Sequence, residues 1–267
     1  MSDVLKIEER GDVDWVTMNR PDSLNALNPE LVEALATYFE RLYLRHDRRI
    51  VVLQGAGRGF CSGLDLTSST ADPDWAKTAP LQAGMATQRR IGDIYRAMRR
   101  CPQPIISLVQ GAAAGGGLSL ALASDIRVAG PKAKFNCAYI RIGLTGADMG
   151  SSYFLPRIVG LSMASELLLT GRFVHADEAL RIGLVSHLVE EDLLESTAEG
   201  LIEHMLRTAP FSLRLTKEAL GYAVDAPSLD AAMAMEDRQQ ILTSQSQDHI
   251  EAMTAFLQKR DPEFGDR

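Results

Sequence analysis

The 267-residue sequence predicts an α/β fold with a helical C-terminal region. Short apolar segments with strand patterns alternate with amphipathic helical patterns early in the chain, and the later patterns are almost all helical. The composition, 46% hydrophobic and 24% charged residues, is that of a globular protein, and the chain is long enough for a sizeable core. We therefore expect a core at residues 1–200 and a C-terminal helical region at residues 201–267.

The first half of the chain contains most of the expected strands. Two short strands flank the turn residues Gly11 and Asp12. A helix then starts at Asn28, a good N-cap that is followed by Pro29 at the first helical position, and it extends to about residue 46. The elements expected next are a buried strand at 49–57, a mobile surface loop at 67–81, a helix at 82–99, a strand at 104–111, an apolar helix after 115–117 and a strand at 125–130.

The second half of the chain is expected to be mostly helical. Apolar residues recur there at helical spacing, and only one short segment has a strand pattern. The expected helices are at 150–169, 176–182, 192–208, 211–224, 228–243 and 248–259, and the strand is at 183–190.

Composition and charge exclude several classes of partner. The formal net charge of −7 argues against a nucleic-acid-binding surface. No apolar stretch approaches the ~18 to 20 residues that a membrane span needs, and the N-terminus lacks the apolar core of a signal peptide. The three cysteines have no paired spacing, which is typical of reduced thiols. We therefore expect a cytoplasmic protein without nucleic-acid or membrane partners.

Three common kinds of site do not match the sequence. After Gly55 and Gly57, the third glycine of a dinucleotide-binding turn would fall at residue 60, which is Phe60. The GxSxG elbow of serine hydrolases does not occur. The five histidines are scattered, and none has the spacing of a metal ligand. We expect no nicotinamide or flavin site, no serine nucleophile and no metal.

Two segments each combine a buried strand with a glycine-rich turn. They are VVLQGAGRGFCSGLDL at 51–66 and ISLVQGAAAGGGLSLALASD at 106–125. Glycine lets a ligand approach the main chain closely, and the free N–H groups at a helix start point toward whatever lies there. One N–H from each turn, converging on one point, would form an oxyanion hole. The alternative is that the glycines only make room for tight packing of strand against helix.

Residues 55–66 and 111–125 resemble the two signature segments of the crotonase (enoyl-CoA hydratase/isomerase) superfamily. The similarity covers about residues 5–260. It continues through RPDSLNAL at 20–27, AKFNCAYIRIGL at 133–144, LPRIVG at 155–160 and LTGRFVHADEALRIGLVSHLV at 169–189. Each motif alone is weak, but together they are specific.

The resemblance implies a crotonase-like spiral of ββα units with a C-terminal helical trimerisation region, assembled as a homotrimer or a dimer of trimers. It implies an acyl-CoA substrate bound in the core at 1–200, with no cofactor other than the coenzyme A that the substrate carries. It also implies that the main-chain amides of Leu64 and Gly116 form the oxyanion hole. Two such donors stabilise a thioester enolate by several kcal/mol where water is excluded.

The resemblance also nominates residues that would bind coenzyme A. They lie in the RPDSLNAL segment, in the first signature and on the last helix, which in many members comes from a neighbouring subunit. The candidates are Arg20, Ala26, Leu27, Arg58, Ser62, Asp65 and Lys259. For Arg20, Arg58 and Lys259 the alternative is a solvated surface charge.

The acid/base residues depart from the family pattern. Typical hydratases use two glutamates, and the corresponding residues here are Ser119 and Tyr139. Ser119 is no strong base without a partner, and a tyrosine of ordinary pKa is protonated at pH 7. Tyr139 could position or protonate the substrate, or it could only pack in the core.

Asp148 is the one acid that remains nearby, in a loop where some family members carry a working aspartate. The adjacent apolar segment GLTGA would raise its pKa toward a value useful for proton transfer. The alternative is that Asp148 caps the helix that follows.

The sequence thus predicts an enzyme that stabilises a thioester enolate, either an enoyl-CoA hydratase or a double-bond isomerase. A lone carboxylate suits a 1,3-proton transfer better than water addition, which benefits from a separate acid and base. Two alternatives stay open. One is an acyl-CoA thioester hydrolase or an aroyl-CoA dehalogenase-like enzyme, and the other is an acyl-CoA-binding protein without catalytic activity.

Overall fold

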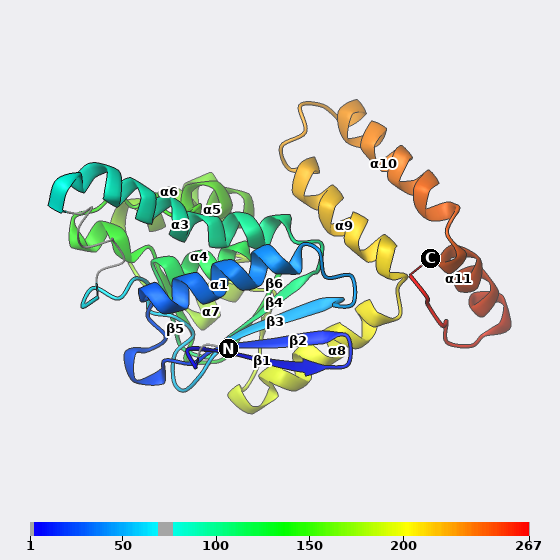
Figure 1. The fold of residues 1–267 in the computed structure, drawn as a ribbon, viewed down its shortest axis with the longest axis horizontal. Helices are drawn as coiled ribbons and strands as arrows, with labels where there is room; N and C mark the ends of the chain where they lie inside the picture. Colours follow the sequence, from blue (N-terminus) through cyan, green and yellow to red (C-terminus); the bar gives the residue numbers. More distant parts are fainter. Residues whose placement is uncertain (1–2, 69–76, 267) are drawn as a thin grey trace.

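A six-stranded sheet forms the centre of the molecule (Figure 1). The computed structural model describes residues 3–68 and 77–266. The sheet order is β1-β2-β3-β4-β6-β9, in which β1 is antiparallel to β2 and all other neighbours are parallel. The strands are β1 (Leu5–Arg10), β2 (Val13–Met18), β3 (Ile50–Gly55), β4 (Ile105–Val109), β6 (Ile126–Ala129) and β9 (His187–Leu188). Parallel strands need long crossovers, which explains the helices between them.

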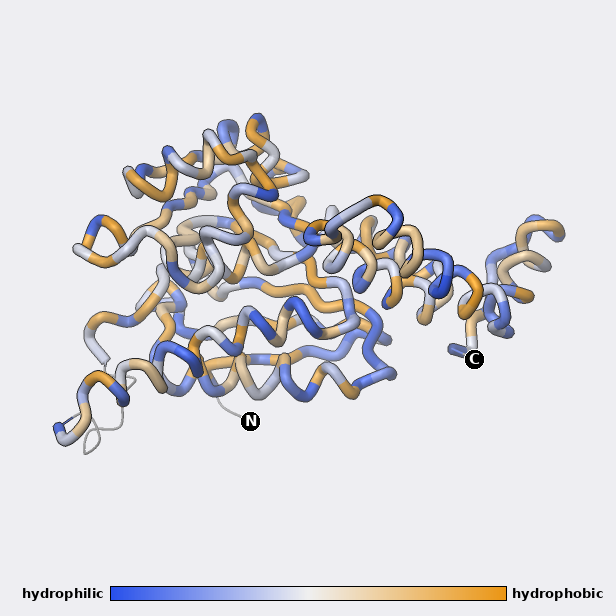
Figure 2. The backbone as a smooth tube through the Cα atoms, turned by 90° about the horizontal axis from the view of Figure 1, so that it is seen from above, coloured by the Kyte–Doolittle hydropathy of each residue, from blue (hydrophilic) through white to orange (hydrophobic). Residues whose placement is uncertain are grey.

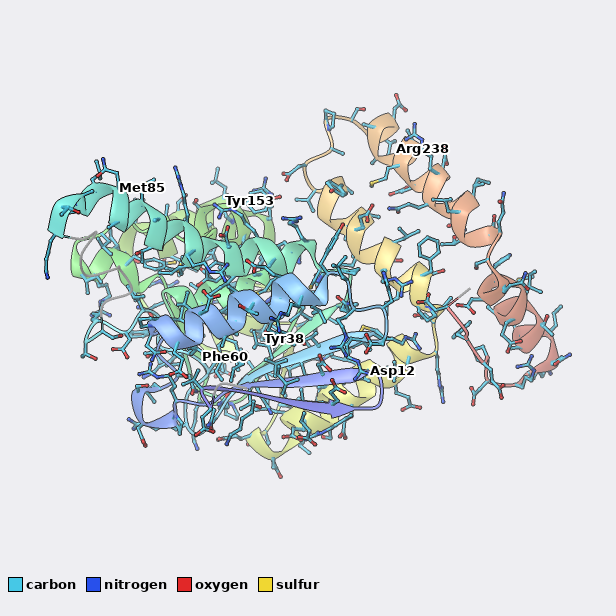
Figure 3. The ribbon with its side chains drawn as sticks, in the orientation of Figure 1. Asp12, Tyr38, Phe60, Met85, Tyr153 and Arg238 are labelled. Atoms are coloured by element: carbon cyan, nitrogen blue, oxygen red, sulfur yellow. The ribbon has the colours of Figure 1, made fainter. Side chains whose placement is uncertain are left out.

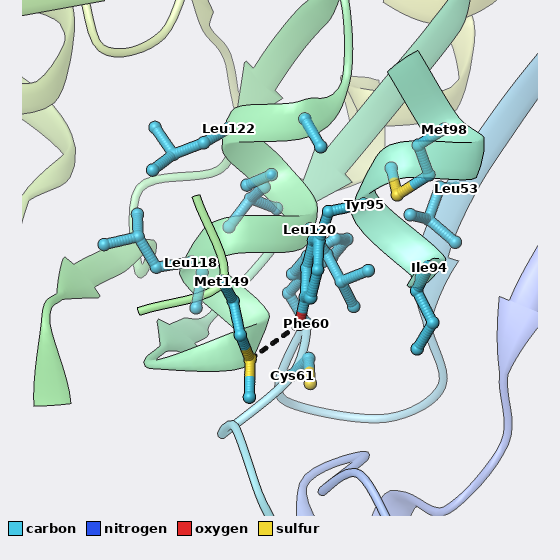
Figure 4. Packing of buried hydrophobic residues seen from close by; sticks show 14 of the residues in the cluster. Leu53, Phe60, Cys61, Ile94, Tyr95, Met98, Leu118, Leu120, Leu122 and Met149 are labelled. Atoms are coloured by element: carbon cyan, nitrogen blue, oxygen red, sulfur yellow. Dashed lines mark hydrogen bonds between the residues drawn. The ribbon is translucent and has the colours of Figure 1, made fainter. Parts of the chain in front are cut away.

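Side chains alternate between two apolar layers along the strands. On β3, Val51 and Leu53 belong to one buried cluster, whereas Ile50 and Val52 belong to the other. The first cluster is covered by α1 (Pro29–Leu42), α3 (Pro80–Arg100) and α4 (Gly116–Ala123), and part of it is shown in Figure 4. The second is covered by α8 (Leu194–Leu206), which spans the predicted boundary at residue 200. The predicted α/β core is therefore present, with the long helices on both faces of the sheet.

A second, three-stranded sheet lies beside the first and was not predicted. It consists of β5 (Ala112–Ala114), parallel to β7 (Lys134–Asn136), which is antiparallel to β8 (Val174–His175). Three alanines and two-residue strands have little strand propensity of their own, so pairing between distant segments decides their conformation. The short helix η2 (Ala138–Ile142) follows β7 and carries Tyr139.

Several predicted boundaries were wrong. The helix expected at 150–169 is two helices, α5 (Ser151–Val159) and α6 (Leu161–Thr170), because Gly160 between them has φ +79°, outside the helical region. The first helix ends at Leu42 rather than near residue 46, and the strand expected at 183–190 is only β9. Residues 69–76 of the predicted 67–81 loop lie outside the described residues. The remaining short elements are α7 (Ala176–Arg181), η1 (Pro21–Ser23) and η3 (Glu191–Leu193).

The last three helices form an arm that projects from the core (Figures 1 and 2). They are α9 (Pro210–Ala223), α10 (Leu229–Ser244) and α11 (Gln247–Gln258). Lys217 of α9 attaches the arm, because its buried ammonium lies 2.9 Å from the Asp125 carboxylate and donates to the Gln103 carbonyl at 2.7 Å. Burial alone would raise the pKa of Asp125, but Lys217 and Arg99 together hold it below its ordinary value. No helix within the described residues is long and apolar enough to span a membrane.

Candidate active site

The two glycine-rich turns lie side by side. Cys61 forms a parallel bridge with Ala113, in which the Cys61 amide donates to the Ala112 carbonyl at 2.9 Å and the Ala114 amide donates to the Cys61 carbonyl at 3.0 Å. On its other side, the first turn forms a second parallel bridge, between Leu64 and Leu27. The segments 20–27, 55–66 and 111–117 therefore meet at one place in the fold.

Glycine is required where these turns approach each other. Gly63 has φ +94°, and a Cβ atom there would lie 2.7 Å from the Ala114 carbonyl oxygen and 3.4 Å from the Gly116 amide nitrogen. A Cβ atom on Gly117 would lie 2.0 Å from the Cys61 carbonyl oxygen, closer than any real contact. The main chains of the two turns touch directly, and the Gly116 amide lies next to the residue that precedes Leu64.

The amides of Leu64 and Gly116 are placed to donate outward. The bridge to Leu27 uses the carbonyl of Gly63 and the amide of Asp65, so the intervening Leu64 N–H points away from that neighbour. Gly116 is the first residue of α4, where an amide has no acceptor within the helix. Among the described residues, neither amide donates to a main-chain carbonyl of the surrounding turns. This geometry fits the predicted oxyanion hole, which stays a prediction.

Ser119 and Tyr139 form a neutral pair beside α4. Both are buried, and the Ser119 Oγ and Tyr139 Oη atoms lie 3.3 Å apart. Burial raises the pKa of Tyr139 further above its ordinary value, so the phenol stays protonated at neutral pH. The two positions where hydratases are expected to carry glutamates are thus hydrogen-bonded to each other and carry no charge.

Asp148 is a half-buried carboxylate in the loop before α5. Its Oδ1 accepts the Met149 amide at 2.7 Å and also accepts the Gln88 side-chain amide. Burial raises the pKa of Asp148, and these two hydrogen bonds oppose that shift. The alternative role as an N-cap is not what the structure shows, because the cap position of α5 is Gly150 and the only main-chain amide that donates to the Asp148 side chain among the described residues is that of Met149.

Helix α3 supplies two residues that the sequence analysis missed. Gln88 contacts Asp148, and the buried Tyr95 donates its hydroxyl to the Gly116 carbonyl at 3.1 Å. The Tyr95 hydroxyl also lies 3.1 Å from the Met149 sulfur (Figure 4, dashed line). Residues seven apart share a helix face, so this spacing could have indicated a common environment. Neither residue type by itself suggests a role in a site.

Four of the predicted coenzyme A residues, Arg20, Ala26, Ser62 and Asp65, make hydrogen bonds within and between the 20–27 segment and the first signature. The Arg20 guanidinium donates to the Ala26 carbonyl and lies 2.9 Å from the Asp65 carboxylate. Thr67 and Arg20 together lower the pKa of Asp65. The Ser62 hydroxyl donates to the Ser23 carbonyl at 3.3 Å. Arg20 therefore connects the 20–27 segment to the first signature at 55–66, and it would do so with or without a ligand.

The other predicted coenzyme A residues are spread more widely. Leu27 is fully buried, and its amide donates to the Gly63 carbonyl at 2.7 Å, whereas Arg58 is exposed. Lys259 ends α11 in the left-handed conformation, φ +53°, at the far end of the arm from the glycine turns (Figure 1). Within one chain the structure does not bring Lys259 to the other candidates.

Within residues 3–68 and 77–266, no group of three or more His, Cys, Asp or Glu side chains is arranged to hold a metal ion. The groups that the described part of the chain brings together at this site include main-chain amides, the Asp148 carboxylate and the neutral Ser119–Tyr139 pair.

Comparison with known proteins identifies the family of this chain. The family model described as enoyl-CoA hydratase/isomerase matches residues 8–267. A relative from Mycobacterium leprae, named probable enoyl-CoA hydratase, is 39% identical over 95% of this chain and 86% of its own length. The 1,2-epoxyphenylacetyl-CoA isomerase of Escherichia coli is 36% identical over 99% of this chain and 98% of its own.

Solved structures give the same result. The crystal structure of a probable enoyl-CoA hydratase/isomerase from Mycobacterium abscessus has 36% sequence identity and superposes with a TM-score of 0.91, covering 99% of both chains. The predicted fold and the predicted family are therefore confirmed. The chain belongs to the enoyl-CoA hydratase/isomerase family of the crotonase superfamily.

Proposed function

We propose that this enzyme of the enoyl-CoA hydratase/isomerase type moves a double bond in an acyl-CoA thioester by a 1,3-proton transfer, with Asp148 as its acid/base. One observation carries the proposal: the site has one half-buried carboxylate, Asp148, while Ser119 and Tyr139 form a neutral pair. Water addition needs a base for the water and an acid for the substrate carbon, whereas a double-bond shift reuses one group in both roles.

The reaction would begin with the thioester oxygen bound by the amides of Leu64 and Gly116. The Asp148 carboxylate removes a proton from the α-carbon of a 3-enoyl thioester, and the electrons of the broken C–H bond move into an enolate on the thioester oxygen. Two preorganised N–H donors stabilise that charge. The Asp148 carboxylic acid then returns the proton to the γ-carbon, which leaves a 2-enoyl thioester and the starting carboxylate.

The acyl group would lie along the N-terminal half of α3. Leu81 and Met85 lie on the same helix face as Gln88, at i, i+4 and i+7. Both are exposed apolar side chains, and Figure 3 shows Met85 on this part of α3. An apolar face beside the acid/base favours an apolar acyl group over a charged one. The relative named 1,2-epoxyphenylacetyl-CoA isomerase supports including aromatic acyl groups among the candidates.

The remaining proposals concern assembly and location. The exposed apolar side chains of the arm support a homotrimer or a dimer of trimers, in which Lys259 would reach the coenzyme A site of a neighbouring subunit. The substrate would carry the only cofactor, coenzyme A. The buried thiols of Cys61, Cys101 and Cys137 are unpaired, which supports a cytoplasmic location.

A panel of thioesters tests the proposal. Purified protein is incubated with crotonyl-CoA, aliphatic 3-enoyl-CoA and aromatic acyl-CoA thioesters, and products are identified by mass and by thioester absorbance. We expect 3-enoyl thioesters to be turned over faster than crotonyl-CoA is hydrated. In Asp148→Asn the turnover of 3-enoyl thioesters should fall at least ~100-fold.

The other outcomes identify the alternatives. Release of free coenzyme A, detected with a thiol reagent, would indicate a thioester hydrolase, whereas release of halide from a halogenated aromatic thioester would indicate a dehalogenase-like substitution. Tight binding of thioesters without any turnover would indicate a binding protein. Hydration as the dominant reaction, with Asp148→Asn unaffected, would reject the assignment of Asp148.

A further inference from the structure

Within the part of the chain that the structure describes, Gln88 is the side chain that hydrogen-bonds Asp148 from outside the Asp148 loop. Its Nε2 donates to Oδ1 of Asp148, and the Met149 amide donates to the same oxygen at 2.7 Å. Among the described residues, no donor reaches the other carboxylate oxygen, Oδ2. The two oxygens of the candidate acid/base therefore differ, because one is held by two hydrogen bonds and the other is not.

The backbone around Asp148 does not by itself orient the carboxylate toward α3. The Ser151 amide donates to the Asp148 main-chain carbonyl at 2.8 Å, and the Asp148 amide donates to the Ser151 hydroxyl at 3.1 Å. These bonds fix the loop, and Met149 with φ +47° and Gly150 with φ +83° form its turn. The Asp148 side chain can still rotate about two torsions. Within the described ranges, the hydrogen bond from Gln88 on α3 restricts that rotation from outside the loop.

We propose that Gln88 is a positioning residue for the double-bond shift. It holds Asp148 through Oδ1, so that Oδ2 alone receives the proton from the substrate and returns it. The inference rests on the proposed role of Asp148. A proton transfer between two carbons by one oxygen needs that oxygen to lie within reach of both, and a displacement of about 1 Å can cost roughly 100-fold in rate.

The same contact stabilises the charged form of Asp148. An amide that donates to a carboxylate favours ionisation, which opposes the effect of burial on the pKa. Within the described residues, the titratable groups that sense the charge of Asp148 are the phenols of Tyr95 on α3 and Tyr139 on η2. Burial raises the pKa of both phenols, so both remain protonated. Gln88 is thus the side chain whose replacement should move the titration of Asp148.

The sign of the pH effect follows from the required charge state. Turnover begins with ionised Asp148, so kcat/KM falls as the pH drops through the pKa of that carboxyl. Gln88→Met keeps the length of the side chain but removes the donor, and this change should raise the pKa. Gln88→Glu adds a like charge and should raise it further, whereas Gln88→Lys should lower it.

The experiment is a pH profile of kcat/KM for the wild type and these three variants, using the best 3-enoyl thioester of the panel. We expect kcat of Gln88→Met to fall roughly 10-fold, with a smaller change in KM. The acidic limb should lie in the order Gln88→Lys, wild type, Gln88→Met, Gln88→Glu from low to high pH. A role limited to folding would lower the rate equally at all pH values and leave the limb in place.

A control variant and a reference variant make the result decisive. Gln82→Met makes the same change six residues earlier on α3, at a position for which no hydrogen bond to Asp148 is found among the described residues, and should leave the acidic limb unchanged. If Asp148→Asn abolishes turnover but the Gln88 series does not shift the limb, the positioning role of Gln88 is wrong and the proposed function stands. If Asp148→Asn keeps full turnover, both are wrong.

Discussion

At the scale of single residues, the two turns of the candidate site approach each other so closely that only glycine fits at two positions. Gly117 sits where any Cβ atom would overlap the Cys61 carbonyl, and Gly63 adopts a left-handed conformation against Ala114. In the predicted oxyanion hole the side chain of Leu64 would not matter, because the proposed donor is its main-chain amide. Glycine is therefore required at these two positions for steric reasons, whatever reaction the site performs.

Replacing Gly117 tests that requirement. Gly117→Ala should destabilise the fold by about 3 kcal/mol or more, since a rigid main-chain oxygen lies 2.0 Å from the new atom. Gly200→Ala is the matched control, because Gly200 lies inside α8 with nothing within 4 Å of a Cβ atom. It should stabilise the protein by about 1 kcal/mol. Equal unfolding midpoints in urea for the two variants would contradict the described contact between the turns.

Residue identities predicted part of the site and missed the rest for a physical reason. Glycines after two buried strands indicated the two turns, although tight packing of strand against helix would also explain them. Asp148 was a candidate because it is the one acid nearby, in a loop where some members of the family that the sequence resembles carry a working aspartate. Gln88 is an ordinary exposed helix residue, and its contact with Asp148 depends on how α3 lies across the loop, which the local sequence does not encode.

At the scale of elements, α3 is the support that joins the two halves of the site. Gln88 reaches the acid/base loop, and Tyr95 reaches the Gly116 carbonyl at the start of α4. The Tyr95 hydroxyl also contacts Met149, which follows Asp148 (Figure 4). One rigid helix thus sets the separation between the proposed oxyanion hole and the proposed base.

Tyr95→Phe tests this supporting role. Loss of the hydroxyl leaves the Gly116 carbonyl without this donor, and we expect a loss of stability of about 1 to 3 kcal/mol together with a fall in kcat of about 10-fold. Tyr38→Phe is the control, because it removes the hydroxyl of a tyrosine on α1 (labelled in Figure 3) that donates to Asp14 at 2.9 Å. It should lower stability without changing kcat. If both variants had a similar kcat, the Tyr95 hydroxyl would not support the site.

Element boundaries show where sequence patterns stop being informative. The N-cap of α1 was predicted from Asn28 and is present, since its side chain accepts the Leu31 amide at 3.0 Å. The division between α5 and α6 was missed because apolar periodicity continues through Gly160, and only its positive φ breaks the helix. The small sheet was missed because its strands are two or three residues long and depend on pairing with distant segments.

At the scale of the whole molecule, the arm of three helices exposes many large apolar side chains. Phe256 and Leu257 on α11 are 81% and 75% exposed, and Leu229 on α10 is 74% exposed. A monomer rarely exposes a large contiguous apolar surface. The division at residue 200 into a core and a helical region stays a prediction, as does the trimer.

Light scattering after size-exclusion chromatography tests the trimer. The expected mass is three or six times the chain mass of 29.2 kDa. The double variant Phe256→Asp and Leu257→Asp should shift the protein toward a monomer while far-UV circular dichroism stays unchanged, since both side chains are exposed within one chain. A wild-type mass of one chain would contradict the proposed assembly.

The central claim is that Asp148 exchanges a proton with a carbon next to a thioester held by two main-chain amides. The most direct measurement follows the conversion of a 3-enoyl thioester that carries deuterium at its α-carbon, with the product analysed by mass spectrometry and NMR. The account predicts a 2-enoyl thioester in which α-deuterium has moved to the γ-carbon with the wild-type enzyme, and product formation at least ~100-fold slower in Asp148→Asn under conditions where the variant still binds the thioester. Wild-type products that keep both deuterium atoms at the α-carbon, or equal rates in Asp148→Asn, would contradict it.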